Sequence, residues 1–331
     1  MSVFKLTVQY QTSDGYPVVA EFSQADRFPV RAERRLRLDE DMLLDLQSCG
    51  DSATYGKILG QTLLQGAIWE SFVRARAASA DRMHLLLCIE PTELRVLSWE
   101  RMQVPVGDER WDFLALDQRV PFSLYMPSST DRRFLPFGPR DLRALIVTAS
   151  PNRLAEYGLS PFSALEAATR LGSVLAPIPY CLLAQEPHAP FRLGPPTLDS
   201  LCEVLTQHRF TLLHISCHGQ LRADGETVLF LADQEGSVRP VTATQLIARL
   251  SRLGGSHGLP HLTFLAACET AHPSAEAALG GLGQRLVREL GMPAVIAMTA
   301  KVSVDLATEL SSRFYPRLRA HGAVDVALVE A

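Results

Sequence analysis

Two apolar segments of this chain end on reactive side chains. The first is Leu212-Leu-His-Ile-Ser-Cys-His218-Gly219, and the second is Leu265-Ala-Ala-Cys268-Glu-Thr270. Short apolar runs bounded by polar residues are typical of strands that are buried on both faces of a parallel sheet. A parallel α/β sheet forms its binding sites outside the carboxyl ends of its strands. We therefore expect His218 and Cys268 to meet at one edge of such a sheet.

The chain beyond about residue 142 alternates between strand-like and helix-like segments. Strands are predicted at Leu142–Thr148, Thr211–Ser216, Val228–Ala232, Leu262–Ala267 and Ala294–Thr299, and helices at Ser163–Leu175, Leu198–His208, Ala243–Leu253, Ala275–Leu290 and Val304–Arg319. Helices between strands require mostly parallel pairing and right-handed crossovers. The prediction is an α/β fold whose mostly parallel sheet has helices on both faces.

The first third of the chain has a different pattern, which predicts a smaller α+β lobe. The expected elements are a hairpin of Val3–Gln9 and Tyr16–Phe22, two helices between about Asp39 and Ala78, and a second hairpin of Met83–Ile89 and Leu94–Leu97. The segment Pro127–Pro139 is rich in proline, serine and charge and is the best linker candidate. We therefore divide the chain into an N-terminal lobe, residues 1–138, with a regulatory or inactive protease-like role, and a second domain, residues 139–331.

His218 and Cys268 are a candidate catalytic dyad. A thiol becomes a strong nucleophile once deprotonated, and a histidine can accept its proton and later protonate the leaving amine. Gly219 lets the backbone approach a substrate carbonyl closely, so the amides of Gly219 and Cys268 are the expected oxyanion hole. The interval between His218 and Cys268 also matches the roughly fifty residues that separate the caspase histidine from its cysteine. For either residue alone, a core thiol or a hydrogen-bonded loop histidine is the alternative.

Carboxylates near the two segments are weaker candidates. Glu269, next to the nucleophile, is a candidate substrate-binding residue, and Asp305, at the start of a predicted helix, is one only because a family resemblance implies substrate contacts in its neighbourhood. The alternative for Asp305 is a carboxylate that stabilises the first turn of its helix, and for Glu269 it is a solvated side chain. Glu226 and Asp233 are expected to be surface residues.

A metal site is not expected. Zinc prefers thiolate and imidazole ligands, but alternate residues of a strand point to opposite faces, so ligands from one strand would not converge. The residues weighed for such a site are His214, Cys217, His218, Cys268 and His272. We also find no phosphate-binding loop of the nucleotide-binding type, and no cofactor is expected.

Composition limits the classes of partner and the compartment. The net charge of −4 is small and spread along the chain, which argues against a nucleic-acid or membrane surface. The six cysteines form no CxxC pair, and a reducing compartment suits a catalytic thiol. The N-terminus lacks the apolar stretch of a secretory signal, and no apolar run approaches the length of a membrane span. We expect a cytoplasmic protein.

Several motifs together resemble those of CHAT domains, which are proteases of the caspase–separase clan. The motifs are His218-Gly219, Ala266-Ala267-Cys268, Gly291–Met298 and Phe314–Leu318. Upstream, Tyr55–Gly60 and Leu97–Glu100 resemble the N-terminal region commonly found ahead of this domain. The resemblance covers about Leu142 to the C-terminus and implies a caspase-like sheet, with His218 as the base and Cys268 as the nucleophile. Because Glu269-Thr270 replaces the Arg-Gly type of sequence that follows a caspase cysteine, strict cleavage after aspartate is not expected.

The resemblance also implies how such a protease is used. CHAT domains are commonly joined to, or assembled with, sensor and regulatory modules, and some prokaryotic members act in defence by cleaving a partner such as a gasdermin. The expected function is therefore a cytosolic cysteine endopeptidase that cleaves a partner protein, with a gasdermin-like protein as one candidate, under the control of a module in cis or in trans. The alternatives are a catalytically silent binding or scaffold module and a small-molecule hydrolase or transferase with the same dyad.

The C-terminal segment carries apolar residues at helical spacing up to the last residue. It lacks a glycine, asparagine or proline stop signal, and its final turn holds Glu330 rather than a basic residue. The expectation from this pattern is that the intact gene product continues beyond Ala331 with a longer helix and a sensor or regulatory module.

Overall fold

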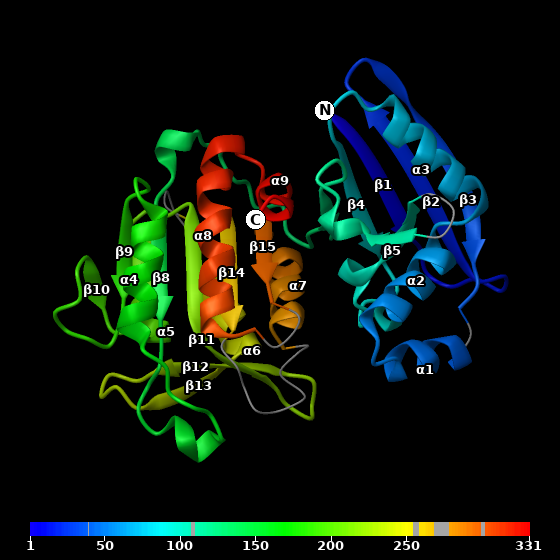
Figure 1. Cartoon of the computed structure of the whole chain (residues 1–331). Coiled ribbons are helices and arrows are strands. Elements are labelled where there is room, and N and C mark those ends of the chain that lie inside the picture. Colours follow the sequence, from blue (N-terminus) through cyan, green and yellow to red (C-terminus); the bar gives the residue numbers. More distant parts are fainter. Residues whose placement is uncertain (39, 107–109, 254–257, 268–277, 299–301) are drawn as a thin grey trace. The chain divides into compact units, whose positions relative to one another are not determined.

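The computed structural model describes the chain except for residues 39, 107–109, 254–257, 268–277 and 299–301 (Figure 1). The chain forms two compact units. The first contains Met1–Met126 and Asp325–Glu330, and the second contains Pro127–Val324 and Ala331.

The first unit is built on a five-stranded sheet of order β3-β2-β1-β4-β7. Its strands are β1 (Ser2–Val8), β2 (Tyr16–Gln24), β3 (Arg27–Leu36), β4 (Met83–Ile89) and β7 (Phe122–Leu124), and a separate hairpin pairs β5 (Gln103–Val106) with β6 (Arg110–Phe113). The predicted first hairpin is confirmed, because β1 and β2 pair antiparallel. The second predicted hairpin is wrong, since β4 pairs in parallel with β1 and β7.

The segment after β4 forms short helical turns because its apolar side chains pack inward. Leu94 and Trp99 are buried, and the Trp99 indole donates a hydrogen bond of 2.8 Å to the Leu94 carbonyl. Leu94 and Leu97 therefore contribute to the core of the lobe although the segment Leu94–Leu97 does not pair as a strand. The 3-10 turns of the described chain are Thr92–Leu94, Trp99–Arg101, Leu114–Leu116, Pro139–Asp141 and Leu154–Tyr157.

Three helices follow β3, rather than the two predicted, because the helical segment is broken at Leu64-Gln65 as well as between Ser48 and Ser52. They are α1 (Glu40–Ser48), α2 (Ser52–Leu63) and α3 (Gly66–Ala78), and the short helix α9 (Val324–Val329) lies near the C-terminus. Gly60 of α2 has a packing role: a Cβ at this position would lie 1.8 Å from the Gln103 carbonyl oxygen. The close approach of α2 to β5 therefore requires a glycine there.

The second unit contains the larger sheet. Six strands, in the order β10-β9-β8-β11-β14-β15, pair in parallel, and β12 and β13 extend the far end of β11 as antiparallel strands. Their bounds are β8 (Ala144–Thr148), β9 (Tyr180–Leu183), β10 (Arg192–Gly194), β11 (Leu212–Leu221), β12 (Thr227–Ala232), β13 (Val238–Thr242), β14 (Leu262–Ala267) and β15 (Ala294–Ala297). The sequence did not predict β9, β10 or β13.

Helices cover both faces of this sheet, as Figure 1 shows. They are α4 (Ala164–Leu175), α5 (Leu198–Gln207), α6 (Ala243–Ser251), α7 (Ala278–Leu290) and α8 (Val304–His321). Helices α4 and α8 pack together on one face, while α5, α6 and α7 bury their apolar residues with Leu213, Ile215 and Leu265 on the other. The predicted α/β fold, with a mostly parallel sheet between helices and a smaller N-terminal sheet, is confirmed.

Candidate active site

Strand β11 carries His218 at the point where the strand changes partners. The parallel ladder with β8 ends at the pair Ser216–Thr148, and the ladder with β14 ends at Cys217–Ala267. From His218 to Leu221 the strand pairs antiparallel with β12, and His218 lies opposite Phe230. The predicted strand end at Ser216 is therefore wrong: β11 runs on to Leu221, because β12 supplies a new ladder, and His218 lies inside the strand.

The ring of His218 is buried and has one hydrogen-bond partner. The side chain is 1% exposed, and Nε2 lies 2.8 Å from the Ser160 carbonyl oxygen. A carbonyl can only accept, so Nε2 carries the proton and donates it. Nδ1 is also buried and has no hydrogen-bond partner among the described residues. The neutral ring therefore presents its unprotonated nitrogen to the side away from Ser160.

The segment that holds His218 in this orientation lies between β8 and α4. Phe162 packs the edge of its ring against the imidazole, with a centroid distance of 5.6 Å, and its backbone N–H donates to the Ser150 hydroxyl at 2.9 Å. Ser163, which was predicted as the first residue of this helix, is its N-cap and accepts a hydrogen bond from the Glu166 amide. Sequence reasoning did not identify Ser160 or Phe162, because a backbone carbonyl and a ring contact leave no motif.

Burial lowers the pKa of His218 below its ordinary value, because the charged imidazolium loses hydration. The hydrogen bond to the Ser160 carbonyl acts in the opposite direction and raises this pKa, but it is the smaller of the two effects. His218 is therefore neutral near pH 7 and can accept a proton.

A second histidine, His214, lies on the same face of β11 and has both ring nitrogens hydrogen-bonded. Nδ1 is 2.8 Å from the Tyr315 hydroxyl, Nε2 is 3.1 Å from the Ser216 hydroxyl, and the ring stacks on Phe264. Burial lowers the pKa of His214 to about 3, so this ring is neutral at physiological pH.

A small cavity lies beside this cluster, lined by residues of α4, β11, β14 and α8. Its volume of about 20 Å³ holds about one water molecule. It is lined by Ala167, Leu171, His214, Ser216, Ala266, Ala307, Thr308 and Ser311.

Of the other predicted site residues, the structure describes Gly219 and Asp305. Gly219 is buried in β11, opposite Leu229. Asp305 lies in the exposed first turn of α8 and pairs with Arg170 of α4 at 3.0 Å. Cys268 and Glu269 lie outside the described residues. The structure thus describes His218 and Gly219 on one strand and Asp305 on a separate helix.

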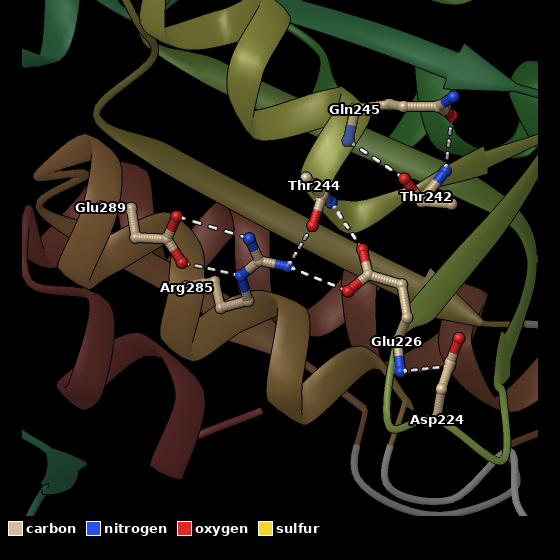
Figure 2. Close-up of polar contacts among 7 residues, drawn as sticks. All are labelled: Asp224, Glu226, Thr242, Thr244, Gln245, Arg285 and Glu289. Carbon is tan, nitrogen blue, oxygen red and sulfur yellow. Dashed lines mark hydrogen bonds and ion pairs between the residues drawn. The ribbon is translucent and has the colours of Figure 1, made fainter.

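Glu226 was expected to be a surface residue; its side chain is 26% exposed and also contacts two helices. Its carboxylate accepts a hydrogen bond of 2.7 Å from the Thr244 amide at the start of α6 and lies 3.4 Å from Arg285 of α7 (Figure 2). Thr242, the N-cap of α6, forms a capping box with Gln245 beside this contact. Asp233 accepts from the Ser237 amide at 2.7 Å within the β12–β13 turn.

Two general features can be stated for the described part of the chain. No group of three or more His, Cys, Asp or Glu side chains is arranged there to hold a metal ion. Within the same residues, no helix combines the length and the apolar character that a bilayer span requires.

Comparison with known proteins gives one family match. The model of the CHAT domain family matches residues 55–331, which is most of the chain. The search of curated proteins gave no match.

Proposed function

Because this chain belongs to the CHAT domain family, we propose that it is a cysteine endopeptidase in which His218 is the general base and Cys268 the nucleophile. The CHAT domain is a family of the caspase-like clan of cysteine peptidases. The family match covers both residues, and both occur in the motifs that resemble those of the family.

The observation that carries the proposal is the state of the His218 ring. The Ser160 carbonyl fixes the proton on Nε2, and Nδ1 is left as a buried acceptor without a partner among the described residues. Buried polar atoms are nearly always hydrogen-bonded, so an unpaired imidazole nitrogen needs an explanation. In the proposed peptidase, the Cys268 thiol is the hydrogen-bond donor to this nitrogen.

The register of the described strands supports the proposal that Cys268 is the partner of this nitrogen. Ala267, the last residue of β14, pairs with Cys217 in the parallel ladder; His218 follows Cys217 in the sequence, and Cys268 follows Ala267. Consecutive Cα atoms lie about 3.8 Å apart, so Cys268 follows directly from a backbone position adjacent to the histidine strand. This register supports the pairing of the two residues.

The proposed reaction follows from these roles. Nδ1 of His218 takes the proton of the Cys268 thiol, and the thiolate attacks the substrate carbonyl carbon to form a tetrahedral oxyanion. The amides of Gly219 and Cys268 are the proposed donors to that oxyanion. His218 then gives its proton to the leaving amine, and the Ser160 carbonyl stabilises the imidazolium in between. Water hydrolyses the resulting thioester and restores the thiol.

The substrate in this proposal is a partner protein, and the activity is controlled by a sensor or regulatory module. A gasdermin-like protein is the first candidate substrate, as the family resemblance implies. Glu269 and Asp305 remain proposed substrate contacts, with the pair that Asp305 forms with Arg170 as the competing role.

Incubation with a peptide library and with candidate protein substrates tests the proposal. The wild-type chain is expected to cleave, and Cys268→Ala and His218→Ala, each folded by circular dichroism, are expected not to. Cleavage by either folded variant would rule out the dyad. Cleavage by none of the proteins, with modification of Cys268 by iodoacetamide equally slow in wild type and His218→Ala, would favour a catalytically silent binding module.

The same library measures specificity at the residue before the cut. The sequence after Cys268 differs from that of caspases, so peptides with a neutral residue at this position should be cleaved at least as fast as peptides with aspartate. A profile dominated by aspartate would contradict this prediction.

A further inference from the structure

The main chain of His218 depends on the β11–β12 hairpin for its orientation. Strands β8 and β14 hold β11 only as far as Ser216 and Cys217. Beyond them, β12 is the ladder partner of β11 among the described residues, from His218–Phe230 to Leu221–Thr227. A shift of this hairpin would therefore move the imidazole.

The turn of the hairpin directs Glu226 toward two helices. The Arg222 amide donates to the Glu226 carbonyl at 2.9 Å, and the Glu226 amide donates to the Asp224 carboxylate at 3.0 Å. Gly225 between them has φ = +80°, a conformation that favours glycine. The backbone of Glu226 is thus fixed at both its N–H and its carbonyl.

The carboxylate of Glu226 joins the hairpin to α6 and α7 (Figure 2). It accepts from the Thr244 amide at 2.7 Å and lies 3.4 Å from Arg285 Nη1. The same guanidinium donates to the Thr244 hydroxyl at 3.2 Å and to Glu289 at 2.7 Å. The Thr244 amide and Arg285 help to hold the pKa of Glu226 below its usual range, so the carboxylate is ionised at neutral pH.

Helix α7 is the element that follows the Cys268 segment in the chain. It begins at Ala278, after residues 268–277, and Arg285 lies two turns into it. The helix packs closely on the start of β12: a Cβ at Gly281 would lie 3.8 Å from the Thr227 hydroxyl. Arg285 therefore connects α7, the described helix that follows Cys268 in the sequence, to the β11–β12 hairpin.

We propose that Glu226 and Arg285 are positioning residues for the dyad, acting on His218 through the β11–β12 hairpin. The inference rests on the proposed peptidase function. It assigns a role to two residues that lie outside the dyad and its oxyanion hole.

The geometry separates this pair from the ordinary surface ion pairs of the molecule. Arg313 and Glu309 lie within one helix, and their side chains are 58% and 56% exposed. Arg285 and Glu226 are 32% and 26% exposed and connect three elements. Exposed pairs contribute little to stability, so a surface role alone predicts no effect of Arg285 on catalysis.

The test compares Glu226→Gln, Arg285→Gln and Arg285→Lys with the matched control Arg249→Gln. Arg249 pairs with Asp199 at 2.5 Å and joins α6 to α5, away from the hairpin. The readouts are kcat and KM on the best peptide of the library, the rate of Cys268 alkylation by iodoacetamide at pH 7, and the melting temperature. Alkylation is followed by mass spectrometry at Cys268 itself.

Glu226→Gln and Arg285→Gln are expected to lower kcat about tenfold with little change in KM, because small displacements of catalytic groups reduce rates strongly. Alkylation of Cys268 should slow in parallel, and Arg285→Lys should recover part of both. The double variant should be no worse than Arg285→Gln, since the two residues act as one unit. Arg249→Gln should keep wild-type kcat.

Two outcomes would overturn the inference while leaving the peptidase function intact. One is a wild-type kcat in both glutamine variants. The other is a loss of kcat in Arg249→Gln equal to theirs, which would indicate a general effect of stability. A wild-type chain with no cleavage and no His218-dependent alkylation would instead contradict the proposed function.

Discussion

Two histidines on the same face of β11, one in the middle of the strand and one near its far end, differ in how their ring nitrogens are hydrogen-bonded. His214 lies inside the parallel ladder, and both its nitrogens have side-chain partners, Tyr315 and Ser216. His218 lies where the ladder ends, and one nitrogen has no partner among the described residues. Both rings are buried and both have a lowered pKa. Burial alone therefore does not distinguish the two histidines of β11, whereas the hydrogen bonding of their ring nitrogens does.

The largest expected effect is on activity. His218→Ala should lower kcat by at least about a hundredfold, the usual contribution of a general base. His214→Ala should leave kcat per folded molecule unchanged, because His214 takes no part in proton transfer. Rates normalised to the folded fraction measure this contrast. Equal losses in the two variants would remove the distinction between the histidines.

For stability we expect the opposite order: His214→Ala should destabilise the folded chain more than His218→Ala does. His214→Ala removes a packed ring and leaves the Tyr315 and Ser216 hydroxyls unpaired, which costs about 2–4 kcal/mol of unfolding free energy. Tyr315→Phe should cost about 1 kcal/mol, since it removes one hydrogen bond to the same ring. Urea unfolding measures both values. A destabilisation by His218→Ala larger than that by His214→Ala would contradict the structural role of His214.

The pH dependence of stability should also depend on His214. Its pKa is about 3 in the folded chain and about 6.5 when unfolded, so the unfolded state binds the extra proton between these values. The stability contributed by the neutral ring is complete above pH ~6.5 and falls by about 1.4 kcal/mol per pH unit toward pH 3. His214→Gln, which cannot titrate, should lose stability less steeply in this range. If the unfolding free energy of wild type and His214→Gln fell equally steeply with pH, the prediction would be contradicted.

The smallest predicted effect concerns Phe162, whose ring packs on His218. Phe162→Ala removes a ring contact worth about 0.5–1.5 kcal/mol, so kcat/KM should fall about twofold to tenfold. It also admits water to the imidazole, which weakens the desolvation that lowers the His218 pKa. The acid limb of the pH–rate profile, with a midpoint below about 6.5 in wild type, should move upward. A downward shift would show that Phe162 does not shield the ring.

Apolar periodicity predicted the larger sheet well and the smaller lobe less well. Strand β14 was predicted with its observed bounds, Leu262–Ala267, because Leu262–Ala266 are buried and all its residues except Thr263 are apolar. Strand β3 was missed, since most of its residues are exposed and its arginines hide any alternation. Leu94–Leu97 was mistaken for a strand because burial inside a helical turn selects the same apolar residues.

The sequence by itself determined which segments are buried strands of the large sheet and which residue types bring chemistry to them. It placed His218 and Cys268 in comparable strand contexts and matched them to one family. It could not distinguish His218 from His214 by hydrogen bonding, because both follow apolar residues in the same strand. That difference depends on Ser160 and Tyr315, which approach β11 from distant parts of the chain. Only the tertiary structure decided which nitrogen is satisfied and which is left free to accept a proton, since hydrogen bonds between distant segments exist only after the chain has folded.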